Sequence, residues 1–141
     1  FAANLKRVYP LPDLVHTVST TALGEVRQPK YPANLLELGY HDNYADAAWV
    51  ENNMDAIARE LARSLTEYFG LPFIEPQPVV QGTVSTSGSP LRLRAYPSAA
   101  GQTIALMPNG ASVTVYGTWQ GWNVVHYNGS VGYAAEAYIE S

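Results

Sequence analysis

The sequence predicts two domains of different class, an α/β segment followed by a small all-β barrel. Charge supports this division, because residues 1–75 hold six Lys and Arg against ten Asp and Glu, whereas residues 76–141 hold two of each. Glycine shows the opposite bias, with eight of the eleven glycines after residue 80. Three prolines within seven residues separate the two parts and restrict the backbone to extended conformations. We therefore expect one domain over residues 1–72, a semi-rigid linker over 73–81 and a second domain over 82–141.

Composition limits the classes of function. The chain has 141 residues, of which 47% are apolar, and a net charge of -4 at pH 7. This apolar share supports a folded core, and the negative balance argues against nucleic acid as a partner. No apolar run approaches the ~18 residues of a membrane span, and no basic-then-apolar signal peptide opens the chain. The absence of cysteine excludes disulfides, thiolate metal sites and cysteine nucleophiles.

The first domain is expected to contain a buried strand after a less regular start. Residues 1–9 are compatible with the end of a helix, and residues 14–27 are a weaker strand candidate. Residues 32–39 open with a proline and close with a glycine, and they are apolar at both alternating faces. This pattern predicts a strand in a sheet that is covered on both sides. The apolar positions are Ala33, Leu35, Leu36 and Leu38.

The clearest helix of the sequence is expected over residues 53–69. Apolar side chains recur there at the spacing of one helix face, which predicts a single buried stripe. Asn52 or Asn53 supplies an amino-terminal cap, and Gly70 ends the helix. The pair Asn43 and Asp46 predicts a short helical turn just upstream. The stripe consists of Val50, Met54, Ile57, Ala58, Leu61, Ala62 and Leu65.

The second domain alternates between apolar and polar residues throughout. Residues 91–94, 112–116 and 123–127 have the pattern of short strands, separated by Pro, Gly and Asn turns. Asn128-Gly129 is a tight-turn signal between strands of hairpin length. About five short strands in about sixty residues predict a small antiparallel barrel.

Residues 82–141 resemble a bacterial SH3-like (SH3b) domain. The order and the spacing of five segments carry the resemblance, which implies an SH3-like barrel that binds peptidoglycan of the cell wall. The segments are Leu91-Arg-Leu-Arg-Ala-Tyr-Pro97, Pro108-Asn-Gly-Ala-Ser-Val-Thr-Val115, Gly121-Trp-Asn-Val-Val125, Asn128-Gly-Ser-Val-Gly-Tyr133 and Tyr138-Ile139.

Residues 1–73 are similar to the C-terminal part of a zinc-dependent N-acetylmuramoyl-L-alanine amidase. The segment Pro32-Ala-Asn-Leu-Leu-Glu-Leu-Gly-Tyr-His-Asp-Asn43 and the helix that follows carry this similarity. The fold it implies is an α/β fragment holding the last strand and helix of the amidase domain. In that family a zinc-bound water attacks the amide between the muramoyl group and L-Ala. The matching Glu37 is implied to transfer the proton, which is sensible beside a metal-activated water.

The resemblance places zinc in the intact parent protein and not in this chain. The family's ligands, two His and a Glu, lie in segments upstream of everything present here. The only histidines are His16, His41 and His126, and no pair of them has metal-ligand spacing. Because the chain begins at Phe1, we expect it to be a piece of a longer protein. We expect no metal to be bound by this chain, and we expect the chain alone to be inactive.

Each candidate site residue also has a structural explanation. Glu37 is a carboxylate in an apolar strand, and the alternative to catalysis is an ion pair with Arg or Lys. His41 either contacts substrate or hydrogen-bonds backbone in its loop. In the barrel, Tyr96 and Trp119 lie in or beside turns and are the candidates for exposed, substrate-binding rings.

Other barrel residues have weaker assignments. Trp122 and Tyr133 are expected mainly in the core, because a barrel of this size needs large side chains there. Arg92 and Arg94 project to one face, where they are able to receive a carboxylate or simply meet solvent. His16 and His126 are expected to have no chemical role.

Together these observations predict a secreted or cell-wall-associated bacterial protein. It is the C-terminal region of a peptidoglycan hydrolase that cleaves the bond between N-acetylmuramic acid and L-alanine, with an SH3b wall-binding module. The alternative is a non-catalytic wall- or peptide-binding protein with an amidase-like remnant. Because residues 33–38 are apolar on both faces, either the missing N-terminal part of the catalytic domain or a second copy is expected to cover them.

Overall fold

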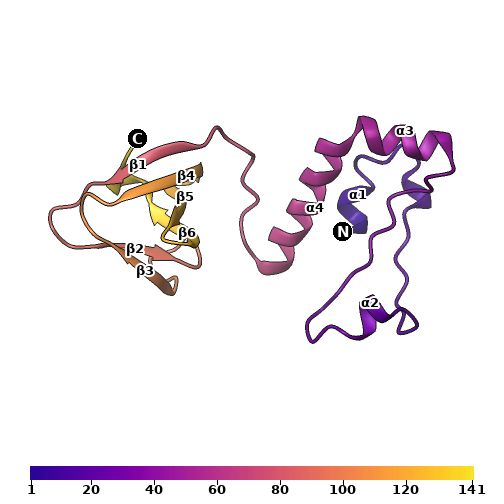
Figure 1. Cartoon of the computed structure of the whole chain (residues 1–141), viewed down its shortest axis with the longest axis horizontal. Helices are drawn as coiled ribbons and strands as arrows, with labels where there is room; N and C mark the ends of the chain where they lie inside the picture. Colours follow the sequence, from indigo (N-terminus) through magenta and orange to yellow (C-terminus); the bar gives the residue numbers. More distant parts are fainter. The chain divides into compact units, whose positions relative to one another are not determined.

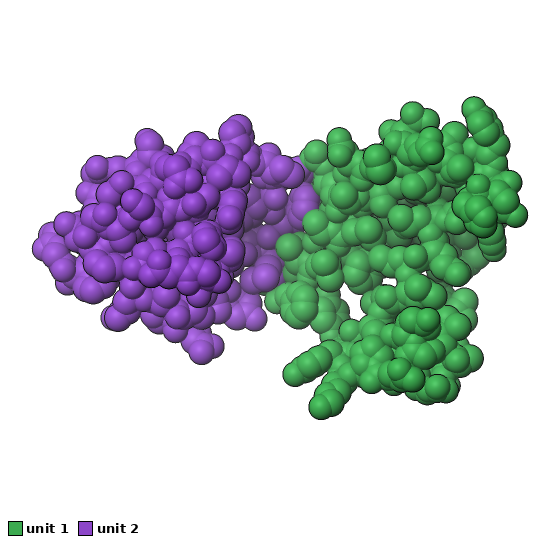
Figure 2. Space-filling view, viewed as in Figure 1, with its two compact units in different colours: residues 1–70 green, residues 71–141 purple.

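The chain divides into two compact units, residues 1–70 and residues 71–141 (Figure 2). A computed structural model describes every residue from 1 to 141. The first unit contains helices and no strands, whereas the second contains all seven strands and one short 3-10 helix (Figure 1). We call them the helical unit and the barrel unit. No helix in either unit combines the length and the apolarity that a membrane crossing requires.

The helical unit packs its first helix against its longest one. Figure 1 shows α1 lying beside α4, and their contact buries Leu5 and Ile57. Asn4 is buried in the same contact, where its amide hydrogen-bonds to side chains of α4. The helices are α1 (Ala2–Leu5), the 3-10 turn η1 (Pro12–Leu14), α2 (Gly24–Arg27), α3 (Tyr44–Asn52) and α4 (Met54–Phe69).

The predicted helix ends are largely confirmed. Oδ1 of Asn43 accepts hydrogen bonds from the backbone N–H groups of Ala45 at 2.9 Å and Asp46 at 3.3 Å, which caps α3. Gly70 ends α4 in the left-handed conformation at φ 66°. The predicted side-chain cap of α4 is absent, since the amide of Asn53 donates backward to the carbonyl of Trp49 at 2.8 Å.

The strand expected over residues 32–39 is not formed, and neither is the weaker one over residues 14–27. An isolated extended segment leaves its backbone N–H and C=O groups unpaired, and residues 1–70 offer no other strand to pair with it. The residues expected to be buried on both faces are accordingly open to solvent. Leu35 is 48% exposed, and Leu36 is exposed as well. The last strand of the predicted α/β fragment is therefore missing here, and only its helix is present.

The apolar stripe of α4 is not the face that α4 buries. The buried positions are Ile57, Glu60 and Ser64, so α1 covers the side where the stripe meets the polar face. Leu65, near the centre of the stripe, is 49% exposed, and Met54 is also exposed. At 100° per residue, the buried face is rotated by roughly a quarter turn from the centre of the stripe.

The barrel unit is one antiparallel sheet in the order β3-β2-β6-β5-β4-β1-β7. Seven strands replace the five that were predicted, and the strands expected at 91–94, 112–116 and 123–127 are all present. The elements are β1 (Val80–Val84), β2 (Leu91–Arg94), β3 (Thr103–Met107), β4 (Ser112–Trp119), β5 (Trp122–Tyr127), β6 (Ser130–Ala135), the 3-10 turn η2 (Glu136–Tyr138) and β7 (Ile139–Glu140).

Alternation along the strands builds the core of the barrel unit. Every second residue of β2 and β4 points inward, as period-two patterning predicts. Asn128 and Gly129, with φ of 46° and 78°, form the predicted tight turn between β5 and β6. The core residues are Val84, Leu91, Leu93, Met107, Val113, Val115, Val125 and Ala134.

Part of the predicted linker belongs to the barrel unit. Val80 and Gln81, its last two residues, pair with β4 as the start of β1. Further upstream, Oε1 of Gln77 accepts the backbone N–H of Thr118 at 3.2 Å. The proline-rich segment is therefore held against β4 as well as being stiffened by proline.

Candidate functional site

The surface of the barrel unit contains a groove of about 490 Å³. Its walls come from the loop before β2, from β2 itself, from the start of β5 and from the end of β6 with η2. A concave site of this size is typical of small-ligand or peptide binding. The lining residues are Thr86, Ser87, Ser89, Pro90, Leu91, Arg92, Arg94, Ala99, Trp122, Ala135 and Tyr138.

Backbone hydrogen bonds hold the loop that forms one wall of the groove. The N–H of Ser85 donates to the carbonyl of Tyr138 at 2.9 Å, and the N–H of Thr86 donates to Oδ1 of Asn109 at 2.7 Å. Gly88 turns the loop with φ 116°, a conformation that side chains rarely adopt. The hydroxyl-bearing wall is thus fixed at its base before any ligand binds.

Two arginines supply the charge of the groove. Arg92 and Arg94 are two residues apart on β2 and so share a face, as predicted from the sequence. Nη1 of Arg94 donates to the carbonyl of Gly101 at 2.6 Å, which fixes this half-buried guanidinium. Arg92 is exposed. No acidic residue lines the groove, and neither arginine forms a salt bridge.

Two aromatic rings face the same groove. Trp122, at the start of β5, is half-buried and lines the groove. It is not part of the buried core cluster, so the prediction that Trp122 belongs mainly to the core is not confirmed. Tyr138 is 48% exposed and forms part of the wall from η2. Tyr133 is buried as predicted, and burial raises the pKa of its phenol above the usual 10.0.

The two aromatic residues predicted to bind substrate lie outside the groove. Tyr96 is 49% exposed, as expected for a turn residue, but it is not part of the groove wall. Trp119 is half-buried and pairs with Trp122 across the turn formed by Gln120 and Gly121. Trp119 was predicted to bind substrate because it lies beside a turn. The ring that lines the groove is Trp122, which follows the turn that Trp119 precedes.

Glu37 and His41 are both exposed, in a segment without strand structure. The premise that Glu37 is buried in an apolar strand is therefore wrong, while its catalytic role stays a prediction. Nearby, Oδ2 of Asp46 accepts the N–H of Tyr40 at 3.0 Å, which folds this segment onto the start of α3. A Cβ on Gly39 would lie 3.0 Å from Cβ of Asp46, so the close approach favours glycine there.

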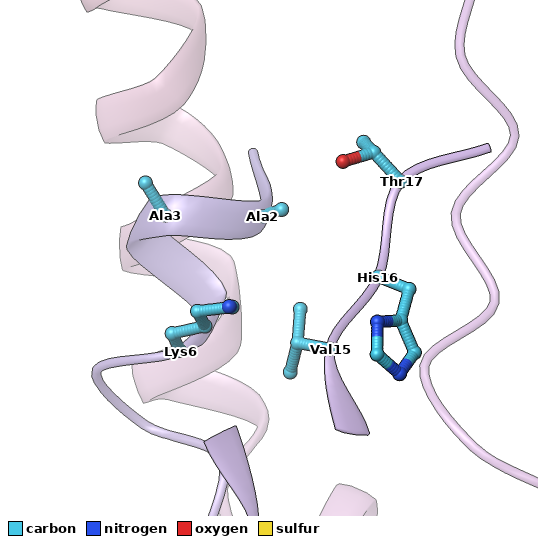
Figure 3. A pocket seen from close by; sticks show the side chains of 6 residues that line it. All are labelled: Ala2, Ala3, Lys6, Val15, His16 and Thr17. Atoms are coloured by element: carbon cyan, nitrogen blue, oxygen red, sulfur yellow. The ribbon is translucent and has the colours of Figure 1, made fainter. Parts of the chain in front are cut away.

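None of the three histidines belongs to a cluster of potential metal ligands. No three His, Cys, Asp or Glu side chains come together as a set of metal ligands. His16 lines a hollow of about 420 Å³ together with Lys6, the residue that follows α1 (Figure 3). The other lining residues there are small or apolar apart from one threonine. The ring of His126 lies tilted against Tyr116, with centroids 6.5 Å apart.

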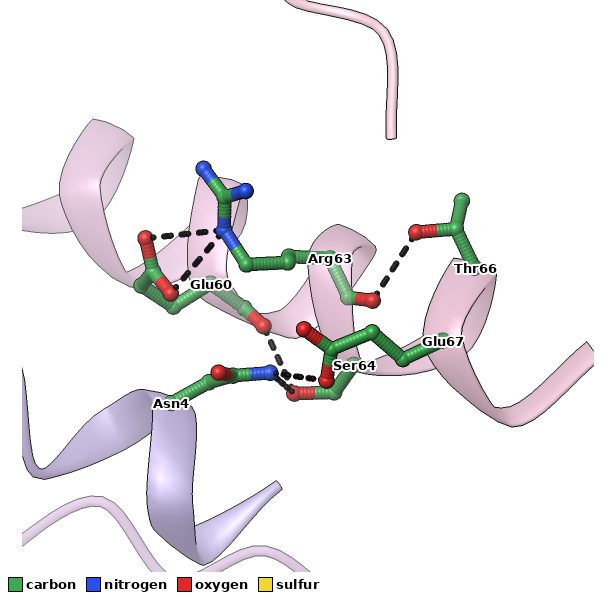
Figure 4. A network of polar contacts seen from close by, with 6 residues as sticks. All are labelled: Asn4, Glu60, Arg63, Ser64, Thr66 and Glu67. Carbon is green, nitrogen blue, oxygen red and sulfur yellow. Dashed lines mark hydrogen bonds and ion pairs between the residues drawn. The ribbon is translucent and has the colours of Figure 1, made fainter. Parts of the chain in front are cut away.

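A polar network joins α1 to α4 (Figure 4). Nδ2 of Asn4 donates to Oγ of Ser64 at 3.0 Å and to Oε2 of Glu67 at 2.8 Å. Buried Glu60 pairs with Nε of Arg63 one turn along the helix, at 3.3 Å. The hydrogen bonds of Asn4 join the two helices, whereas the Glu60–Arg63 pair lies within α4 and leaves Oε2 of Glu60 without a hydrogen-bond partner. The network across the helix contact has a structural role.

Comparison with known proteins identifies the barrel unit. The family model described as bacterial SH3 domain matches residues 89–140. No curated protein matches the chain. The solved structure of NlpC2 from Trichomonas vaginalis is similar at 20% identity and a TM-score of 0.40, over 45% of this chain and 23% of that one. The resemblance of the second half to a bacterial SH3-like domain is thereby confirmed: residues 89–140 are a bacterial SH3 domain, and β2, β5, β6 and η2 of that domain supply most of the groove.

Proposed function

We propose that this is a cell-wall-associated protein whose SH3 domain binds peptidoglycan in the groove. The observation that carries the proposal is the groove itself, which lies on a bacterial SH3 domain and combines aromatic, hydroxyl and guanidinium groups. Bacterial SH3 domains are typical of secreted or wall-associated proteins, and peptidoglycan is their usual partner. The same proposal holds whether or not the helical unit takes part in catalysis.

The chemistry of the groove matches that of the polymer. Peptidoglycan consists of sugar rings and short peptides, whose flat apolar faces stack on aromatic rings. Trp122 and Tyr138 present such rings, and Ser87, Ser89 and Thr86 present hydroxyls that donate and accept hydrogen bonds. Because the walls are held by backbone hydrogen bonds, little ordering is needed when a ligand binds.

Co-sedimentation of the full chain with purified sacculi tests the proposal. We expect wild-type protein to sediment with the sacculi, and Trp122→Ala and Tyr138→Ala to weaken binding by roughly tenfold each. Tyr116→Ala is the matched control, because Tyr116 is an exposed ring outside the groove. Failure of the wild type to bind, or equal binding by all four proteins, would contradict the proposal.

A second proposal concerns the helical unit. We propose that residues 1–70 are the C-terminal part of an N-acetylmuramoyl-L-alanine amidase domain, in which Glu37 transfers the proton. The supporting observation is exposed apolar surface at Leu35, Leu36 and the stripe of α4, which the rest of such a domain would bury. This chain's residues gather no ligand set that fits zinc, so we derive no step through the metal.

An activity assay on the intact parent protein tests the amidase proposal. Wild-type parent is expected to release L-Ala-linked peptides from muramyl peptide, and Glu37→Gln to abolish release while the protein stays folded. Glu25→Gln is the matched control, because Glu25 is also exposed but lies in α2. Full turnover by Glu37→Gln would remove that residue from the mechanism. An inactive parent would favour the alternative of a non-catalytic wall-binding protein.

A further inference from the structure

We infer that the groove selects a peptide that carries a free carboxylate, rather than a neutral glycan or an amidated peptide. The inference rests on the proposed function and specifies which part of peptidoglycan the SH3 domain recognises. On this basis the ligand is the short peptide attached to the muramic acid sugar, in its free-acid form.

All the Lys and Arg side chains of the barrel unit line the groove. Arg92 and Arg94 are the only Lys or Arg among residues 71–141, and both line this one groove. The acidic residues of the same unit are Glu75, Glu136 and Glu140, and none of them lines it. The groove therefore carries the cations of the barrel unit with no counter-charge in its walls.

The guanidinium groups of Arg92 and Arg94 differ in burial and in whether the protein already holds them in place. Arg94 is half-buried and held by the carbonyl of Gly101, so only part of its donor set is used. Arg92 is exposed and has no acidic partner. Arginine presents its N–H donors in a planar fork that matches the two oxygens of a carboxylate. A carboxylate at this end of the groove is thus able to meet both residues.

Two features of the groove bear on which anion binds there: the apolar residues that line it and the small number of its cations. Leu91, Pro90 and Trp122 line the same groove, and apolar side chains beside a charge-assisted hydrogen bond strengthen it by lowering the local dielectric constant. Two guanidinium groups provide enough charge and enough N–H donors to bind one carboxylate. A long phosphate polymer gains affinity from many successive cations, and the barrel unit has no others to offer. These features favour a carboxylate-bearing peptide over an anionic polymer.

Calorimetry with two soluble ligands tests the inference. The probes are the muramyl dipeptide with both glutamate carboxyl groups free and the same compound with both of them amidated. We expect the free acid to bind roughly tenfold or more tightly than the amide, with an affinity that falls as salt is raised. Arg92→Gln and Arg94→Gln are each expected to weaken binding of the free acid to about the level that the wild type shows for the amide. Arg27→Gln, in the helical unit, is the control.

The outcomes separate this inference from the proposed function. Equal affinity for acid and amide would overturn the carboxylate inference and leave wall binding intact. Failure to bind either compound or sacculi would overturn the proposed function as well. Binding of a glycerol phosphate polymer, lost in Arg92→Gln while the peptide does not bind, would assign the groove to phosphate and contradict the inference. Arg92 is exposed, so its variant tests the inference even if Arg94→Gln disturbs the loop at Gly101.

Discussion

The hydroxyl of Tyr9 donates a hydrogen bond to Oδ1 of Asp46 at 3.2 Å and so links the start of the chain to the first turn of α3. The other carboxylate oxygen of Asp46 accepts the N–H of Tyr40. The ring of Tyr9 also lies edge-on against Trp49, with centroids 4.7 Å apart. One carboxylate therefore positions both Tyr9 and the segment that carries Glu37 and His41.

The Tyr9–Asp46 contact predicts a loss of stability at high pH. Burial, then the negative charge of Asp46 and its hydrogen bond, raise the pKa of Tyr9 above 10.0 in the folded protein. The unfolded chain therefore loses this proton at a lower pH than the folded one, so stability is retained below pH 10 and declines above it. Tyr9→Phe is expected to lower the free energy of unfolding by about 1 kcal/mol near neutral pH, through the lost hydrogen bond.

Urea unfolding followed by far-ultraviolet circular dichroism, from about pH 8 to about pH 11, measures this effect. The difference between wild type and Tyr9→Phe is expected to shrink as the pH rises above 10, because only the wild type loses the contribution of a neutral Tyr9. A difference that stays constant over this range would show that Tyr9 titrates alike in both states.

The rotated face of α4 predicts unequal costs for two similar substitutions. Ile57→Ala removes a side chain that is 4% exposed, and we expect a loss of about 2 kcal/mol or more. Leu65→Ala removes one that is half-exposed, so we expect a loss of less than about 0.5 kcal/mol. Urea unfolding of both variants compares them directly. The sequence-based stripe predicts comparable losses, and that result would contradict the packing of α1 on α4.

Close approach of strands in the barrel predicts a similar contrast between two glycines. A Cβ on Gly132 of β6 would lie 2.6 Å from the carbonyl oxygen of Arg94, so Gly132→Ala must move one strand away from the other. We expect a loss of about 3 kcal/mol and weaker ligand binding, since Arg94 lines the groove. Gly129→Ala has open space around the new Cβ and strains only the turn at φ 78°, at about 1 kcal/mol. Thermal unfolding that ranked Gly129→Ala as the worse variant would count against this register.

The cap of α3 offers a further check on the helical unit. Asn43→Ala removes the acceptor for two backbone N–H groups, and we expect a loss of about 1 kcal/mol in urea unfolding. Asn43→Asp keeps an acceptor oxygen at the same place and is expected to retain most of that stability. Equal losses in the two variants would mean that the side-chain oxygen contributes little.

The sequence predicted features that depend on nearby residues of the chain more accurately than features that depend on contacts between distant segments. The strands of the barrel follow from period-two alternation and turn residues such as Asn128 and Gly129, which are local signals. The cap at Asn43 and the stop at Gly70 are local for the same reason. Residues 32–39 have an equally clear strand pattern, apolar on both faces, but a strand also requires a neighbour, and no residue of 1–70 supplies one.

The groove was harder to predict because it depends on which ring lies on which side of a turn. Trp119 and Trp122 flank the same two-residue turn, and only Trp122 lines the groove. The shared face of Arg92 and Arg94 was visible from their spacing. That Tyr138 of η2 lines the same groove as these arginines depends on tertiary packing, which no local pattern records.

Amide chemical-shift mapping of the full chain with soluble muropeptides tests the central claim most directly. If the SH3 domain binds peptidoglycan in its groove, the largest shifts fall on Arg92, Trp122, Tyr138 and the loop at Ser87. Residues outside the groove, such as Gln81 and Tyr116, are expected to stay unchanged. Shifts centred on the exposed face of β1 and β4, or no shifts at saturating muropeptide, would contradict the account.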